Sequence, residues 1–295
     1  MDRSVFQDEE IGGFINEHFL ALRIHGNKEE GKAFREKYPI SGYPHVIFVK
    51  PDGEEYERIA GFGGNKEVYF EILKDYAAGK NLLSTFLAEL DKSPDDVELN
   101  YKIGKKYIDR WDSEKAKPYL EKVLALDPDN EKGCRTECQL ELAIYEGRFK
   151  KNIVPLKTFI SQVVDDEFLH RAYENLIRYY ERIEKDSAKV LETYAEALVK
   201  FPNDADGLNG YAWFIYTKRI KSMYAEGIQM AEKAVKIDPE GAGIWDTLGW
   251  LLYETGDLQK ATDAMQKAHD ISPDSKYFNK NLEKFKKELE EKETT

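Results

Sequence analysis

Two cysteines, Cys134 and Cys138, are the only thiols in the sequence, and they lie four residues apart on a predicted helix. Their side chains therefore share one helix face, as a redox pair or half of a metal site would require. The Cys-x-x-x-Cys spacing is neither a dithiol motif nor a zinc-ligand motif, and neither His25 nor His45 completes one. We expect both cysteines to be small packing residues between helices.

Other residues with chemical potential form no recognisable set. The histidines are scattered and make neither an H-x-x-x-H nor an H-E-x-x-H arrangement, so the sequence predicts no metal site, no cofactor and no catalytic group. The run at 61–64 (Gly-Phe-Gly-Gly) lacks the Lys-Ser/Thr of a phosphate loop and reads as a turn. The histidines are His18, His25, His45, His170 and His269.

Composition restricts the class of protein further. The 295 residues are 41% apolar, enough for real cores, and carry 56 acidic against 44 basic residues, a net charge of −12. Such an acidic chain is unsuited to nucleic acid, and no apolar window is long enough for a bilayer span. The N-terminus lacks the pattern of a secretory signal, which predicts a cytoplasmic location; an upstream signal peptide would make it periplasmic or secreted.

Prolines that follow helix-like runs recur with a nearly constant period. Pro128, Pro202, Pro239 and Pro273 are separated by 74, 37 and 34 residues, and the first interval equals two periods. A two-helix unit of about 34 residues is typical of the tetratricopeptide repeat, which this part of the sequence resembles. The resemblance implies an all-α solenoid that binds a protein or a peptide.

The last and the first unit carry small residues at corresponding positions. Gly249 and Ala261 stand twelve residues apart where the two helices of the repeat cross closely, and Gly104 and Ala116 keep the same separation. We expect a linker helix region at 81–96, five units over 97–275, and a capping helix and tail at 276–295. The units are 97–130, 133–166, 171–204, 205–241 and 242–275.

Aromatic residues repeat with the period of one unit. Trp213 and Trp250 are 37 residues apart, as are Tyr216 and Tyr253. These positions lie on the first helix of each repeat and predict a peptide groove with rigid aromatic anchors. The alternative is that each tryptophan packs against the neighbouring repeat. The same stripe includes Asn209 and Asp246, and in the first unit Tyr101, Lys105 and Ile108.

The first 80 residues follow a different pattern. The runs at 19–24 and 45–50 are β-rich, and Pro51-Asp52-Gly53 predicts a hairpin turn after the second run. Helical patterns cover about 8–17, 28–37 and 66–78. The segment resembles the thioredoxin-like domains that precede tetratricopeptide arrays in bacterial proteins. Gly42, Tyr43, Pro44 and His45 match the cis-proline loop of that family, which implies a cis Tyr43–Pro44 bond.

The segment departs from that family at its start. The resemblance implies a central strand and a Cys-x-x-Cys at the N-terminus of the first helix, but the chain begins at Met1-Asp2-Arg3-Ser4, inside that helix. Either the natural protein is longer, or the domain is a shortened, non-catalytic relic.

The sequence therefore predicts an incomplete α/β thioredoxin-like domain over 1–80 followed by an all-α tetratricopeptide solenoid. We expect a protein-interaction scaffold that binds a protein or peptide partner, with neither nucleic acid nor membrane as a partner. The alternative is a fragment of a thiol–disulfide oxidoreductase whose Cys-x-x-Cys lies upstream of Met1. The two differ in whether DNA upstream of Met1 encodes an in-frame Cys-x-x-Cys.

Overall fold

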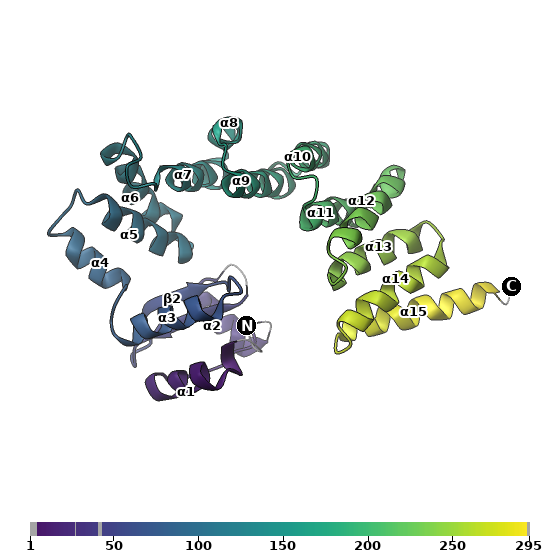
Figure 1. Ribbon diagram of the computed structural model, residues 1–295, viewed down its shortest axis with the longest axis horizontal. Coiled ribbons are helices and arrows are strands. Elements are labelled where there is room, and N and C mark those ends of the chain that lie inside the picture. Colours follow the sequence, from purple (N-terminus) through teal and green to yellow (C-terminus); the bar gives the residue numbers. More distant parts are fainter. Residues whose placement is uncertain (1–4, 27, 41–42, 294–295) are drawn as a thin grey trace. The chain divides into compact units, whose positions relative to one another are not determined.

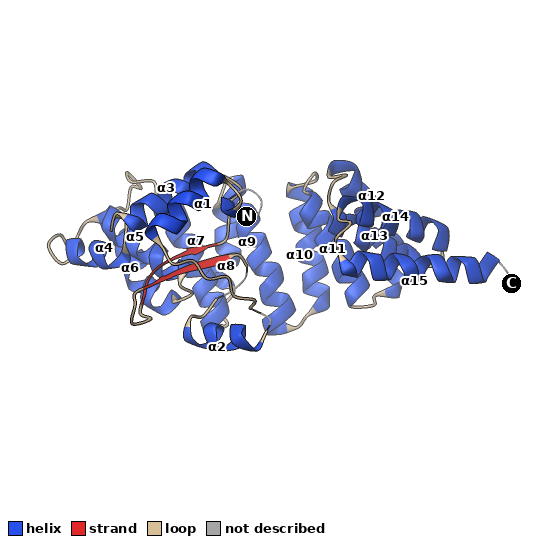
Figure 2. Cartoon of the chain, turned by 90° about the horizontal axis from the view of Figure 1, so that it is seen from below, coloured by secondary structure: helices blue, strands red, loops and turns tan. Residues whose placement is uncertain are grey.

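The computed structural model describes residues 5–26, 28–40 and 43–293. The chain forms two compact units, Met1–Val163 and Val164–Thr295, which we call the N-terminal and C-terminal units. Both are mainly helical, and the two strands lie in the N-terminal unit (Figures 1 and 2). Aspartate side chains accept backbone N–H bonds at the start of six helices. They are Asp8, Asp96, Asp112, Asp165, Asp186 and Asp257.

The N-terminal unit begins with an α/β segment. Its helices are α1 (Glu9–His18), α2 (Glu29–Lys37) and α3 (Lys66–Ala77), and its strands are β1 (His45–Val49) and β2 (Glu55–Ala60). The two strands pair antiparallel around a turn in which Gly53 has a φ of 78°, which glycine adopts without strain. The predicted hairpin and the three predicted helices of this segment are confirmed.

The segment 19–24, predicted as a strand, forms neither helix nor strand, so this prediction is wrong. A strand satisfies its backbone groups only by pairing, and β1 pairs with β2 alone among the described residues. Without a neighbouring ladder, the β propensity of these residues is insufficient to order them as a strand. Leu20 is 92% exposed and Leu22 is 74% exposed as a result.

Five further helices complete the N-terminal unit. They are α4 (Leu83–Leu90), α5 (Val97–Asp109), α6 (Ser113–Leu126), α7 (Arg135–Lys150) and α8 (Val154–Gln162). Helices α5 and α6 pack together around Leu120 and Val123 of α6, and Cys138 of α7 joins the same apolar cluster. A Cβ atom on Gly104 would lie 2.6 Å from Leu120 Cδ2, so the small residue is what permits this helix crossing.

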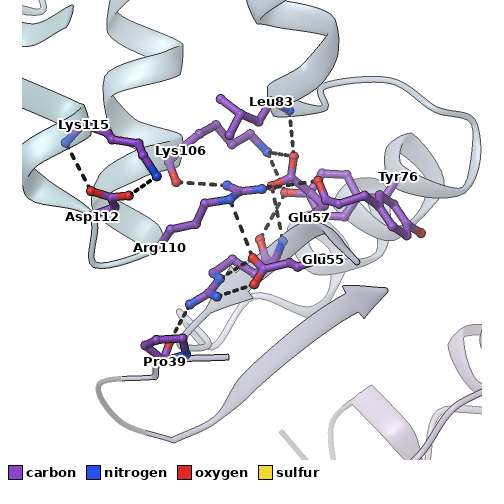
Figure 3. A network of polar contacts seen from close by, with 11 residues as sticks. Pro39, Glu55, Glu57, Tyr76, Leu83, Lys106, Arg110, Asp112 and Lys115 are labelled. Atoms are coloured by element: carbon purple, nitrogen blue, oxygen red, sulfur yellow. Dashed lines mark hydrogen bonds and ion pairs between the residues drawn. The ribbon is translucent and has the colours of Figure 1, made fainter. Parts of the chain in front are cut away.

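A buried network of charged groups joins β2 to α5 (Figure 3). The Glu57 carboxylate is completely buried and accepts hydrogen bonds from Arg110 Nη2 at 2.7 Å and from the backbone N–H of Leu83 at 3.0 Å. Lys106 Nζ lies 3.0 Å from the same carboxylate and donates to Tyr76 Oη at 2.8 Å. Two cations thus neutralise one buried anion, and the hairpin and the first repeat are held together within this unit.

The C-terminal unit contains helices joined by short turns, and its described residues form no strand. The longer ones are α9 (Asp166–Tyr179), α10 (Ser187–Lys200), α11 (Ala205–Thr217), α12 (Tyr224–Ile237), α13 (Ala242–Glu254), α14 (Leu258–Ile271) and α15 (Lys276–Glu293). A π-helical turn (Tyr180–Glu184) follows α9. A short 3₁₀ helix (Lys221–Met223) lies in the turn between α11 and α12, in the unit 205–241, which is three residues longer than a 34-residue repeat.

Small residues permit close helix crossings in this unit, as Gly104 does in the first repeat. A Cβ atom on Gly249 would lie 3.3 Å from the backbone oxygen of Ala261, so α13 and α14 approach almost backbone to backbone. Gly256, with a φ of 85°, forms the turn between them. The last helix, α15, buries Leu282 and Phe285 against α13 and α14 and covers the apolar face that a final repeat would leave open.

Candidate functional site

The aromatic residues singled out in the sequence occupy equivalent places on successive helices. Helix α11 follows its N-cap Asp204, and α13 follows its N-cap Gly241. Asn209 and Asp246 are each the fifth residue after the cap. Trp213 and Trp250 are each the ninth, and Tyr216 and Tyr253 the twelfth. Residues spaced by three and four share a helix face, so each helix presents one polar and two aromatic side chains in a stripe.

The four rings form a continuous ladder. Trp213 and Tyr216 have centroids 5.3 Å apart, and Tyr216 stacks on Trp250 of the next repeat at 5.7 Å with an interplanar angle of 26°. Trp250 then meets Tyr253 edge to face at 5.6 Å. The rings therefore pack between the two repeats, as the alternative interpretation of the sequence expected, and the peptide groove stays a prediction. We call these four residues the aromatic ladder.

The two ends of the aromatic ladder differ in exposure. Trp213 is 39% exposed, whereas Tyr216 and Trp250 are half-buried. Trp250 contacts Phe285 of α15 edge to face at 5.0 Å, and Tyr253 stacks on the same ring at 4.5 Å. The α13 end is therefore covered by the chain's own last helix, and the Trp213 end is open.

Further contacts from α15 hold the covered end. Lys284 Nζ lies 4.9 Å from the Trp250 ring centroid and 4.4 Å from that of Tyr253, within cation–π range. Trp250 Nε1 donates to Tyr277 Oη at 3.1 Å. These α15 residues match no repeat consensus, and sequence analysis missed them.

Asp246 is a buried acid beneath this end of the ladder. Tyr277 Oη donates to Asp246 Oδ2 at 3.3 Å, and Oδ1 is buried with no hydrogen-bond partner among the described residues. Burial raises the pKa of Asp246 to about 6, since the charged form loses its hydration. The equivalent Asn209 also has a buried oxygen, Oδ1, without a partner. The stripe therefore carries buried acceptors whose desolvation is not compensated by a hydrogen bond within the described residues.

A pocket of about 240 Å³ lies between α9, α10 and the start of α11. His170, Glu174 and Ile177 line it and are the fifth, ninth and twelfth residues after the N-cap Asp165, the positions that carry the stripe on α11 and α13. Sequence analysis missed them because this repeat has few consensus residues. Counting from the aspartate that caps α9 would have found them.

The pocket has an apolar floor and a charged rim. Tyr194 and Leu198 come from α10, and Arg178 and Arg182 from α9 and the π-helical turn. His170 Nε2 lies 2.8 Å from Asp204 Oδ2 across the rim. Such a mixture is suited to an extended peptide that carries both apolar and charged side chains.

In the first repeat the corresponding stripe is closed by its own partners. Tyr101 Oη and Lys105 Nζ both donate to the carboxylate of Glu137 on α7. These side chains are therefore engaged within the N-terminal unit.

The two cysteines pack as the sequence analysis expected. Both are free thiols; Cys138 is buried, and Cys134 is half-buried at the start of α7. Burial raises the pKa of Cys138 to about 12 and also raises the pKa of Cys134. Neither thiol is activated as a nucleophile. No group of three or more His, Cys, Asp or Glu side chains in the described residues is placed to hold a metal ion.

The proline loop precedes β1. The Tyr43–Pro44 peptide bond is cis, as predicted, and His45 begins the strand. Gly42 lies outside the described residues. Tyr43 is 60% exposed.

Comparison with known families identifies the repeats. The family model for the tetratricopeptide repeat matches residues 242–275 and residues 97–130. The chain therefore contains tetratricopeptide repeats. No curated protein matches the sequence.

Three solved structures are similar to this chain, and one of them, yeast Tom70, has a TM-score above 0.5. Yeast Tom70 has a TM-score of 0.52 at 16% identity, over 76% of this chain and 47% of Tom70. YrrB, described as a TPR protein with an unusual peptide-binding site, has a TM-score of 0.46 at 14% identity, over 68% of this chain and 97% of YrrB. The TPR domain of Sgt2 from Aspergillus fumigatus has a TM-score of 0.38 at 20% identity, over 45% of this chain and 84% of that domain.

Among the helices of the described part of the chain, none combines the length and the apolar character that crossing a bilayer requires.

Proposed function

We propose that this protein is an interaction scaffold that binds a peptide or an extended partner segment along the stripe of the C-terminal unit. Asn209, Trp213 and Tyr216 of α11 form the open part of the site, and Asp246, Trp250 and Tyr253 of α13 support it. The observation that carries the proposal is the aromatic ladder, which is continuous between repeats yet leaves Trp213 39% exposed.

The exposed part of the Trp213 indole offers a partner a preformed contact surface. The Trp213 ring packs against Tyr216 at a centroid distance of 5.3 Å, so little rotamer entropy is lost when a partner packs on its free surface. Large aromatic anchors of this kind dominate the free energy of binding at protein interfaces. The pocket at α9–α11 provides charged groups for the flanking residues of the same peptide.

A substitution pair tests the site. The full chain is used to select binders from a displayed library of random peptides, and a selected synthetic peptide is then titrated calorimetrically. Trp213→Ala should weaken binding by about 2 kcal/mol or more and leave the melting temperature nearly unchanged, because the ring is partly exposed. Trp111→Ala is the matched control, since Trp111 is 40% exposed in the N-terminal unit.

Trp250→Ala distinguishes anchoring from packing. Because Trp250 packs on Phe285 and Tyr216, its truncation should lower the free energy of unfolding by about 3–5 kcal/mol. The proposed site would be wrong if Trp213→Ala bound the peptide with unchanged affinity. It would also be wrong if Trp111→Ala lost as much peptide affinity as Trp213→Ala.

We also propose that the chain divides as the repeats indicate, with 1–80 as an incomplete thioredoxin-like domain, a linker at 81–96, five repeats over 97–275 and a closing helix. The β1–β2 hairpin supports the thioredoxin-like assignment. The irregular backbone at 19–24 departs from it. On this proposal residues 1–80 contribute structure, because this segment contains no cysteine.

A further inference from the structure

One edge of β1 pairs with no other strand in the described part of the chain. Its partner β2 occupies the other edge, and the hydrogen bond from Gly61 N–H to the Pro44 carbonyl fixes which residues face β2. In an antiparallel ladder this role alternates, so Val46 and Phe48 also bond to β2 and Ile47 faces away from it. The N–H and C=O of Ile47 have no hydrogen-bond partner among the described residues. An edge of this kind is a template for another strand.

The segment 19–24 (Phe-Leu-Ala-Leu-Arg-Ile) is a strand-forming sequence without a strand partner. Phe19 is anchored in the core by its ring, which contacts Phe48 of β1 at 5.3 Å. Leu20 and Leu22 beyond it are 92% and 74% exposed. Two large apolar side chains thus stand in solvent on a segment whose first residue packs against β1.

Charge distinguishes this edge from the rest of the chain. The whole protein has a net charge of −12, which opposes self-association. Residues 19–24 and β1 together contain no aspartate or glutamate, and Arg23 and His45 are their ionisable side chains. A second copy can therefore approach here without bringing carboxylates together.

We propose that a second copy of this chain completes the sheet, with the segment 19–24 of each copy pairing as a strand with the unpaired edge of β1 in the other. Each chain carries both the strand-forming segment and the unpaired edge, so the contact is self-complementary, as a twofold dimer requires. Pairing satisfies Ile47 and buries Leu20 and Leu22. The six residues of the segment are enough to span the five of β1.

The test is the oligomeric state of the full chain by sedimentation equilibrium, from low to high micromolar concentration. We expect the wild type to be a dimer. Leu20→Lys/Leu22→Lys should weaken association by at least about tenfold, because two apolar cross-strand contacts are replaced by charges. The control is Val164→Lys/Val199→Lys in the C-terminal unit, where the side chains are 93% and 80% exposed, and it should remain a dimer.

Amide hydrogen exchange identifies the surface directly. The Ile47 amide should be protected in the wild type and exchange faster in Leu20→Lys/Leu22→Lys, with circular dichroism unchanged because both leucines are solvent-exposed in the monomer. A monomeric wild type at all concentrations would overturn the proposal. So would a dimer that withstands the leucine substitutions or leaves the Ile47 amide unprotected.

Discussion

Replacing the buried acid beneath the aromatic ladder should change how stability depends on pH. The pKa of Asp246 is raised from 3.8 to about 6 in the folded protein, because burial penalises the charged carboxylate. The folded state therefore binds this proton more tightly than the unfolded chain. The resulting stabilisation is complete below about pH 4 and is lost as pH rises to about 6.

The magnitude follows from the shift. Roughly two pKa units correspond to about 3 kcal/mol, the cost of holding Asp246 ionised at neutral pH. In Asp246→Asn the side chain stays neutral at every pH. The variant should therefore gain stability relative to the wild type as pH rises from 4 to 7, by about 3 kcal/mol over that range.

Urea unfolding at a series of pH values measures the effect. Three of the four tryptophans lie in the C-terminal unit, so their fluorescence follows the unfolding of the part that contains Asp246. Asp274→Asn, at an exposed acid of the same unit, should give a curve parallel to the wild type. If Asp246→Asn also stays parallel to the wild type from pH 4 to 7, the carboxyl is not held in a desolvated site.

Two other predictions concern the N-terminal unit. Glu57→Gln should lower the free energy of unfolding by about 3–5 kcal/mol, because the half-buried Lys106 and Arg110 lose the buried carboxylate that both of them contact. Glu54→Gln, at an exposed carboxylate of the same hairpin, should change it by less than about 0.5 kcal/mol, and similar losses from the two would contradict the network. The chain should not accelerate insulin reduction by dithiothreitol, because burial raises the pKa of Cys134 and Cys138. Turnover abolished by Cys134→Ser would assign these thiols a redox role.

Local signals made the repeats predictable. Gly249 and Ala261 are small because the backbones of two helices meet there, and such a contact lies within one repeat of the sequence. The hairpin turn at Gly53 likewise depends on a few adjacent residues, whereas the cis bond at Pro44 was expected from the resemblance to the thioredoxin-like family.

Contacts between distant residues were not predictable in this way. Glu57 meets Arg110 across 53 positions, and nothing in either residue's neighbourhood indicates the other. Phe285 contacts Trp250 of the aromatic ladder, and it lies on α15, a helix that does not match the repeat consensus. The error at 19–24 has the same origin, because propensity describes a segment alone, whereas a strand depends on a neighbour.

The buried Glu57 network limits where the chain can be cut. A fragment beginning at residue 81, the start of the helices that lead into the repeats, would retain Lys106 and Arg110 and lose the carboxylate that neutralises them. Lys106 and Arg110 would then lose the carboxylate that they contact directly, a cost that the small first repeat is poorly able to absorb. The shortest fragment that keeps the first repeat intact must include β2, so the hairpin belongs to the minimal folding unit of the N-terminal repeats.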